Sequence, residues 1–359
     1  MTTTVRTPRF GLQFTTHLAN DHSVRELVRL ADLAQQRGFH QVWINENIGF
    51  RSQAVTLSAI AASIPINIGT AITVPYFHHP LDVVATLTTL AELGEGRELC
   101  VGVARGDLGQ ADQHVQITQP LAMVEQFTRF ARLAVSGTTV KYADFPVLQR
   151  YFNLAPHGRF TSMVPGCGRF AFFGGGNGPK ALAATGRAMD GLLSSGTFLP
   201  LARIGRLRTM HRVAEDAAAG SQPGKKLRKV CELNVSLSLD RCAAIEFPKR
   251  QVAHSVLQWE ALGFTDAEYA QLGVQRSDVL ALQRHWQVGG TLDGAAHLVT
   301  DEMLHACYLA GTPEDVARQL RTYCALALEL GYEQIIFAKL GPDYRAAIEL
   351  LSEQILPSL

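Results

Sequence analysis

Short apolar runs alternate with longer amphipathic segments along most of the 359-residue chain. The apolar runs have the length and composition of buried strands, and they occupy residues 9–15, 41–45, 66–74, 98–104, 170–173, 191–194, 230–239 and 334–338. Apolar residues at helical spacing predict helices at residues 24–33, 55–62, 80–93, 120–135, 181–188, 199–219, 313–331 and 343–355. Because strands and helices alternate, we expect a parallel sheet with right-handed crossovers.

The number of these strand and helix pairs is that of a (β/α)₈ TIM barrel, so we expect an α/β fold in which residues 1–359 form a single barrel domain. Residues 243–305 have a helical pattern without a strand signal, which predicts a helical insertion after strand seven, over one end of the barrel. Residues 137–154 have hairpin character, and residues 307–310 form either a short strand or the approach to a helix. A doubly wound sheet is the alternative architecture, but its usual length and fingerprint fit less well.

A glycine-rich segment, GGGNGPK at residues 174–180, joins the fifth predicted strand to its helix. Glycine tolerates positive φ and lets a ligand approach the backbone, and Pro179 suits the first position of a helix. The N-terminus of that helix and the charge of Lys180 favour a bound anion, which predicts a phosphate site. The alternative is an ordinary turn between strand and helix. The segment is not a nucleotide P-loop, because GxxxxGK[ST] is missing.

Polar residues follow the first four predicted strands, and in a barrel the carboxyl ends of the strands meet at the catalytic face. These candidates are Gln13, His17, Asn45, Glu46, Asn47, Tyr76, His78, His79, Arg105 and Asp107. We favour Glu46 because it directly follows a buried run, where a carboxylate is costly unless a polar group meets it. The histidines have an alternative role in local hydrogen bonding, and Arg105 and Asp107 have one as a local ion pair.

The amino-acid composition limits the kinds of molecule that this protein is expected to bind. Hydrophobic residues make up 47% of the chain and charged residues 18%, which excludes a disordered protein. Lys plus Arg (33) nearly equal Asp plus Glu (32), so nothing favours binding to nucleic acid or to an anionic membrane, and we expect a small molecule or another subunit as partner. The N-terminus does not resemble a signal peptide, and no apolar run has membrane-spanning length, so we expect a cytoplasmic protein.

The motifs of hydrolysis and of metal binding are missing from the sequence. The six cysteines are scattered without CxxC or metal-ligand spacing, and GxSxG and HExxH do not occur, so we expect no metal. A phosphate site in a barrel with few acid or base groups suits a cofactor that brings its own reactivity.

Several sequence blocks carry a resemblance to a known family. In order along the chain they are RFGLQF, VWINENIGFRSQAVTLSAIA, IGTAITVPYFHHP, GRELCVGVARGD, GGGNGPKALAATGRAMDGLL, AGTPEDVARQL and FAKLGPD. With these blocks the chain resembles the luciferase-like flavin and deazaflavin oxidoreductases, and it is most similar to the coenzyme F420-dependent methylenetetrahydromethanopterin reductases.

This resemblance implies an oxidoreductase that transfers a hydride between coenzyme F420 and an organic substrate, with a methylene-tetrahydropterin type one-carbon carrier as one candidate. An FMN-dependent luciferase-like monooxygenase is the alternative within the family. A non-catalytic flavin-binding paralogue is the alternative of another class. The resemblance also implies a homodimer or higher homo-oligomer.

The family's site residues carry over to this chain position by position. Its cofactor acid falls on Glu46, next to Asn47, and both are expected to contact the ring or the substrate. Its strand-three bulge, which often contains a non-prolyl cis peptide against the ring, falls on Ala71 and Ile72. The strand-four turn falls on Arg105, Gly106 and Asp107, and the phosphate loop on Gly175, Gly176, Asn177, Gly178 and Lys180.

Two positions depart from the family pattern. Asn47 stands where members often have histidine, and Gln13 stands where the methylenetetrahydromethanopterin reductases have glutamate. An amide cannot donate a proton as a carboxylic acid can. Asp107 is therefore the leading acid–base candidate, with Glu46, His17 and His78 as further candidate proton donors.

Overall fold

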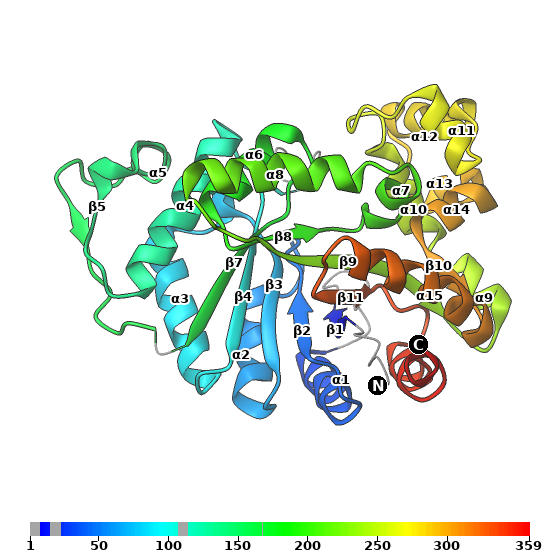
Figure 1. Ribbon diagram of the computed structural model, residues 1–359, viewed down its shortest axis with the longest axis horizontal. Helices are drawn as coiled ribbons and strands as arrows, with labels where there is room; N and C mark the ends of the chain where they lie inside the picture. The colour runs from blue at the N-terminus through cyan, green and yellow to red at the C-terminus, as the bar shows by residue number, and fades with distance from the viewer. Residues whose placement is uncertain (1–7, 15–22, 107–113, 167) are drawn as a thin grey trace.

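Eight parallel strands close into a barrel in this computed structural model, which describes residues 8–14, 23–106, 114–166 and 168–359 (Figure 1). The barrel order is β9-β11-β1-β2-β3-β4-β7-β8, and β8 pairs back with β9. The strands are β1 (Arg9–Phe14), β2 (Gln41–Ile44), β3 (Asn67–Thr73), β4 (Glu98–Val103), β7 (Arg169–Gly174), β8 (Gly191–Ser194), β9 (Arg228–Leu237) and β11 (Gln334–Ala338). The predicted (β/α)₈ barrel is therefore confirmed, and the doubly wound alternative is wrong.

Helices cover the outside of the strands. They are α1 (Val24–Gln36), α2 (Gln53–Ser63), α3 (Pro80–Leu93), α4 (Pro120–Val135), α6 (Pro179–Ala188), α7 (Phe198–Arg203), α8 (Leu207–Ser221), α15 (Pro313–Glu329) and α16 (Tyr344–Leu350). The single helix expected at residues 199–219 is wrong, because α7 and α8 are separate. Gly205 lies between them with a φ of +73°, a left-handed conformation that ends α7 and that glycine adopts without steric cost.

Two segments extend the barrel. The expected hairpin character near residues 137–154 corresponds to β5 (Val140–Lys141) pairing antiparallel with β6 (Arg159–Phe160), with α5 (Pro146–Tyr151) between them. After β9 come α9 (Arg241–Glu246), α10 (Lys249–Leu257), α11 (Asp266–Leu272), α12 (Arg276–Gln287), α13 (Leu292–Ala295) and α14 (Asp301–Cys307). The next element is a short strand, β10 (Leu309–Gly311), which pairs with β9. That residues 243–305 are an insertion within one domain stays a prediction.

Side chains fill the middle of the barrel, and ion pairs lie across its amino-terminal end. Buried side chains that include Trp43, Phe173 and Ile336 fill the interior. At the amino ends of the strands, Arg228 donates to Glu98 Oε1 at 2.7 Å and to Glu333 Oε1 at 2.7 Å. This ion-pair network occupies the amino-terminal end, so a ligand site belongs at the opposite end, where the strands finish. Within the described part of the chain, no helix is long and apolar enough to cross a membrane.

Candidate active site

The sequence-predicted site residues that the structure describes lie at or just beyond the carboxyl ends of five barrel strands. Gln13 lies on β1, Glu46 and Asn47 follow β2, and Ala71 and Ile72 lie on β3. The loop after β4 contributes Arg105 and Gly106, and the glycine loop follows β7. Asp107 and His17 fall outside the described residues, so their expected roles stay predictions.

Gln13 connects three strands through its buried side-chain amide. Its Nε2 donates to the carbonyl oxygen of Ala71 at 3.3 Å and to Glu232 Oε2 at 3.1 Å. The side chain is 2% exposed. Gln13 therefore does not replace the glutamate that the resemblance to the methylenetetrahydromethanopterin reductases implies at this position, but its amide lies against a carboxyl group from β9.

Glu232 is a candidate that the sequence prediction missed. It is 7% exposed, and this burial raises the pKa of its carboxyl group, although the nearby Lys339 ammonium and the hydrogen bond from Gln13 act in the opposite direction. A carboxyl group with a raised pKa holds a proton at a pH where an ordinary glutamate has lost it. The direction of this shift is the one that favours a general acid.

A pattern in the seventh strand could have revealed Glu232. In VCELNVSL, residues 230–237, the polar Glu232, Asn234 and Ser236 recur at every second position. Side chains alternate between the two faces of a strand, so these three share one face, while the apolar residues between them pack into the outer core. Asn234 Nδ2 donates to the carbonyl oxygens of Gly196 at 3.2 Å and Cys307 at 3.3 Å. Polar residues at alternate positions of a buried strand indicate a functional interior face.

Two polar groups form hydrogen bonds with the Glu46 carboxylate, as we expect for a carboxylate directly after a buried strand. Its Oε2 accepts the Val74 backbone N–H at 2.7 Å, and its Oε1 pairs with His78 Nε2. The hydrogen bond to Glu46 raises the pKa of His78, and the carboxylate charge adds to this effect against the opposing effect of burial. Together they form a hydrogen-bonded pair at the mouth of the barrel. A cavity of about 350 Å³ beside the pair is lined by Glu46, Asn47, Ile48, Tyr76, Phe77, His114 and Val115.

The peptide bond between Ala71 and Ile72 is cis, as the resemblance predicts, and the β3–β4 register shifts between Thr70 and Thr73. Both carbonyl groups at this bulge are held by glutamine side chains. Gln13 binds the Ala71 carbonyl, and Gln53 Nε2 donates to the Ile72 carbonyl at 3.2 Å. Gln53, which the sequence prediction also missed, is itself fixed by Thr73 Oγ1 at 2.9 Å.

Ile72 also connects β3 to the glycine loop. A Cβ added at Gly175 would lie 3.0 Å from Ile72 Cγ2, and one added at Gly102 would lie 3.2 Å from the same methyl group. The absence of side chains at both glycines lets the bulge and the loop pack directly together. The bulge predicted to contact the ring therefore lies directly against the loop predicted to contact the phosphate.

The glycine loop leaves the amino terminus of α6 open. Gly178 precedes Pro179 at this terminus and supplies no side-chain cap, and a Cβ added at Gly178 would meet no atom within 4 Å. Asn177 fixes the loop by donating from Nδ2 to Thr197 Oγ1 at 2.9 Å. Helix N–H groups without a side-chain cap, with open space before them, fit a phosphate group.

The expectation that the glycines of this loop adopt positive φ angles is wrong. Glycines with positive φ occur elsewhere among the described residues, but Gly174, Gly175, Gly176 and Gly178 are not among them. Close packing explains at least one of these glycines instead, because a Cβ at Gly174 would overlap Thr185 Oγ1.

Arg105 and Gly106 lie on the turn after β4, where Gly106 has a φ of +94°. The positive charge of Arg105 acts on Tyr76, but burial dominates there and raises the pKa of Tyr76 to about 12. The expected local ion pair of Arg105 with Asp107 stays a prediction, because Asp107 lies outside the described residues. No cluster of His, Cys, Asp and Glu suited to a metal ion occurs in the part of the chain that the structure describes.

Comparisons with known proteins agree with this architecture over the whole chain. The 5,10-methylenetetrahydromethanopterin reductase of Archaeoglobus fulgidus is 25% identical over 98% of this chain and 99% of its own length. The F420-dependent glucose-6-phosphate dehydrogenase of Nakamurella multipartita is 26% identical over 98% of this chain and 96% of its own length. Among solved structures, the coenzyme F420-dependent tetrahydromethanopterin reductase of Methanopyrus kandleri superposes with a TM-score of 0.75 at 20% identity, covering 98% of this chain and 99% of that chain.

A family profile described as luciferase-like monooxygenase matches residues 9–329, which is most of the chain. The chain belongs to the luciferase-like monooxygenase family.

Proposed function

We propose that this protein is an oxidoreductase that transfers a hydride between coenzyme F420 and an organic substrate. The observation that carries the proposal is the close packing of Ile72 against Gly175, which places the residues predicted to contact the ring next to those predicted to contact the phosphate. Relatives that match almost the whole chain, from the Archaeoglobus reductase to the Nakamurella dehydrogenase, support the choice of F420.

The residues present fit such a cofactor. The open N-terminus of α6, with Gly175, Gly176, Asn177 and Gly178 before it, would hold the phosphate, and Lys180 would add a positive charge. Ala71 and Ile72 would support the ring, with Arg105 and Gly106 at its edge. Bound F420 would supply the hydride, and the protein would supply position and proton transfer.

Glu232 is the proton donor we favour among the described residues. Burial raises its pKa, which favours the protonated form of the carboxyl group, and Gln13 Nε2 donates a hydrogen bond to Glu232 Oε2. A proton held there would go to the substrate atom that gains negative charge as the hydride is transferred. The acid that is absent at Gln13 would thus be supplied from the seventh strand.

Glu46 and Asn47 would contact the ring or the substrate from the cavity beside β2. Glu46 is oriented by the Val74 N–H and by His78, so its direction is fixed before a ligand binds. Asp107 stays a predicted acid–base residue.

For the substrate, we propose a methylene-tetrahydropterin type one-carbon carrier. The Archaeoglobus relative is a 5,10-methylenetetrahydromethanopterin reductase, and the Methanopyrus structure is that of a coenzyme F420-dependent tetrahydromethanopterin reductase. The experiment is an anaerobic assay in which reduced F420 is mixed with the methylene-tetrahydropterin and the return of F420 absorbance is followed. Oxidation of F420 that requires the pterin supports the proposal, and no oxidation with any one-carbon pterin would remove this substrate class.

The FMN-dependent monooxygenase stays the alternative, because the family profile carries the monooxygenase description and an FMN-bound monooxygenase is among the similar structures. A protein purified with FMN that consumes oxygen with a substrate would favour it. A non-catalytic paralogue is disfavoured by the two carboxyl groups, Glu46 and Glu232, at the predicted ring site. We also propose a cytoplasmic location and a homodimer or higher homo-oligomer.

A further inference from the structure

Asn234 has a hydrogen-bond acceptor without a donor on the interior face of β9, the face that also carries Glu232. Its Nδ2 donates to the carbonyl oxygens of Gly196 at 3.2 Å and Cys307 at 3.3 Å, which identifies the other amide atom as the oxygen. The side chain is 1% exposed, and its Oδ1 has no hydrogen-bond partner among the described residues. A buried acceptor without a donor costs free energy, so we expect a ligand to donate to Asn234 Oδ1.

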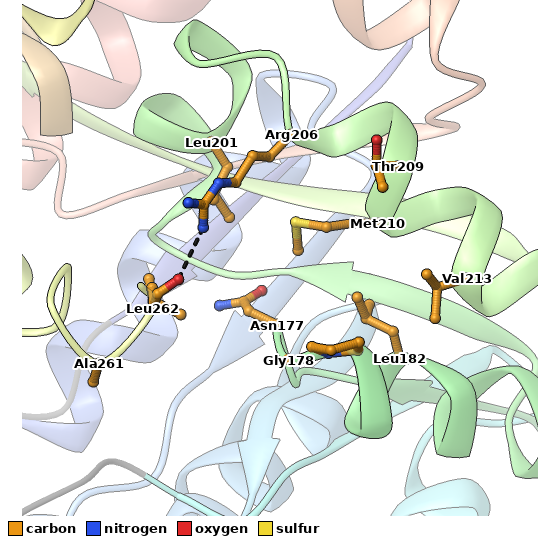
Figure 2. A pocket seen from close by; sticks show the side chains of 11 residues that line it. Asn177, Gly178, Leu182, Leu201, Arg206, Thr209, Met210, Val213, Ala261 and Leu262 are labelled. Carbon is orange, nitrogen blue, oxygen red and sulfur yellow. Dashed lines mark hydrogen bonds between the residues drawn. The ribbon is translucent and has the colours of Figure 1, made fainter. Parts of the chain in front are cut away.

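Gly196 leaves this oxygen and the neighbouring carboxyl group uncovered. A Cβ added at Gly196 would lie 3.3 Å from Glu232 Oε1 and 3.5 Å from Asn234 Oδ1, so a side chain at this position would cover both oxygens. The loop that carries Gly196 is also held from the glycine loop, because Asn177 Nδ2 donates to Thr197 Oγ1 at 2.9 Å. Figure 2 shows Asn177 at the edge of that loop. The loop beside the two oxygens is therefore anchored on both sides.

Lys339 begins above the same part of β9. Ala338, the last residue of β11, pairs in register with Asn234, and the carbonyl oxygen of Leu340 accepts the N–H of Leu237 at 3.2 Å. Lys339 lies between these two anchors. Its φ of +58° is a left-handed conformation that residues other than glycine seldom adopt, and it turns the chain away from the path of the strand.

The ammonium group of Lys339 acts on the interior face of β9. Burial raises the pKa of Glu232 and the pKa of Cys307, and in both cases the charge of Lys339 opposes the rise. Lys339 is half-buried, and its ammonium group has no hydrogen-bond or ion-pair partner in the part of the chain that the structure describes. An ammonium group in this situation is suited to donate to a carbonyl or anionic oxygen of a ligand.

Lys339 and Asn234 lie across the barrel from the predicted ring position. In the closed order of strands, β9 is four strands away from β3 in either direction, so the two strands are opposite each other. Gln13 connects the two sides, since its Nε2 donates both to the Ala71 carbonyl on β3 and to Glu232 on β9. A ring supported by the β3 bulge would therefore leave the side formed by β9 and β11 to the substrate.

We propose that Lys339 and Asn234 bind a cyclic amide edge of the substrate, with its C=O toward the Lys339 ammonium and its N–H toward Asn234 Oδ1. A cyclic amide places these two groups side by side, which matches an ammonium donor and an amide acceptor on neighbouring strands. A pterin ring carries such an edge, so the inference rests on the substrate class of the proposed function and names residues that would select it. A deazaflavin ring carries one too, and the experiment separates the two sources.

The test compares two pteridines and a set of matched variants. Dimethylpterin has the cyclic amide, whereas its diamino analogue has an amino group in place of the carbonyl and no N–H beside it. Equilibrium dialysis gives the dissociation constant of each pteridine, and a fluorescence titration gives that of F420. Lys339→Met removes the charge, Lys339→Arg keeps it, and Lys226→Met removes the charge of an exposed lysine elsewhere. Gly196→Ala is a second variant, in which a methyl group covers the two oxygens, and circular dichroism checks the fold of each protein.

We expect the wild-type protein to bind dimethylpterin about tenfold more tightly than the diamino analogue, because the analogue leaves the ammonium and the buried acceptor unpaired. Lys339→Met and Gly196→Ala should remove most of this difference without changing the affinity for F420. Lys339→Arg and Lys226→Met should keep the difference.

Equal affinity of the wild-type protein for the two pteridines, or a difference that survives in both Lys339→Met and Gly196→Ala, would overturn this inference while leaving F420 binding intact. Weaker F420 binding by Lys339→Met, with unchanged pteridine binding, would also overturn it, because the amide edge would then belong to the cofactor. A wild-type protein that prefers dimethylpterin but does not bind F420 would support this inference and overturn the proposed function.

Discussion

Gln13 and Glu232 are joined by a buried hydrogen bond of 3.1 Å between the first and seventh barrel strands, although 219 positions separate them in the sequence. The amide donates and the carboxyl accepts, so the pair places an acid at the interior face without a carboxyl group on β1. The acid function that the sequence lacks at position 13 is therefore expected at position 232.

Glu232→Gln should remove this acid while keeping the size of the side chain. We expect kcat to fall by about 10²- to 10⁴-fold, the usual contribution of a positioned acid or base. The affinity for F420 should stay close to that of the wild-type protein, because the predicted phosphate loop is untouched. Steady-state kinetics and a fluorescence titration measure the two effects. A variant with wild-type kcat would remove Glu232 from the mechanism.

Stability should depend on pH through the same residue. Burial raises the pKa of Glu232 above its ordinary value of 4.5, so between that value and the raised one the folded state binds more protons than the unfolded state. Its contribution to the free energy of unfolding is complete below about pH 4.5 and is lost as pH rises through the raised pKa. Urea denaturation at a series of pH values should show this loss in the wild-type protein and a weaker one in Glu232→Gln. If the free energy of unfolding depended on pH identically in the two proteins, a raised pKa of Glu232 would be contradicted.

Glu46→Gln should lower the pKa of His78 toward its ordinary value of 6.5, because the carboxylate is the main cause of the shift. The contribution of His78 to the free energy of unfolding is complete below its pKa in the unfolded chain. It is lost as the pH rises through its higher pKa in the folded protein. NMR titration of the imidazole ring gives the pKa, with His79→Gln as the variant that assigns the neighbouring signal. A His78 pKa that does not respond to Glu46→Gln would mean that the pair does not form.

Gln53→Ala should destabilise the fold, because Gln53 donates to the carbonyl oxygens of Ile44 and Ile72 and accepts from Thr73 Oγ1. Buried groups left without partners cost about 1–3 kcal/mol, so we expect a loss of that size in the free energy of unfolding. Gln35→Ala on the exposed face of α1 is the matched control and should change little. Equal effects of the two substitutions in urea denaturation would contradict the supporting role of Gln53.

The barrel could be predicted from the sequence because its strands are buried on both faces and its helices have one apolar face, patterns that are local in the chain. Glu46 could be predicted for the same reason, since a carboxylate directly after a buried strand needs partners. Its partners, the Val74 N–H and His78 Nε2, could not be predicted. The polar alternation of β9 indicates that Glu232 faces the interior, but its hydrogen bond with Gln13 forms only when β1 and β9 are brought together. Gln53 reaches the Ile72 carbonyl only when α2 packs against β3, and no local pattern encodes which carbonyl or carboxyl group a glutamine reaches. The break between α7 and α8 was missed because the apolar pattern continues across Gly205.

A fluorescence titration of the purified protein with F420 and with FMN tests the central claim most directly. The account predicts saturable binding of F420, no retention of FMN through purification, and weaker F420 binding when Gly178→Asp places a negative charge before the open N-terminus of α6. Retained FMN together with no binding of F420 would contradict it.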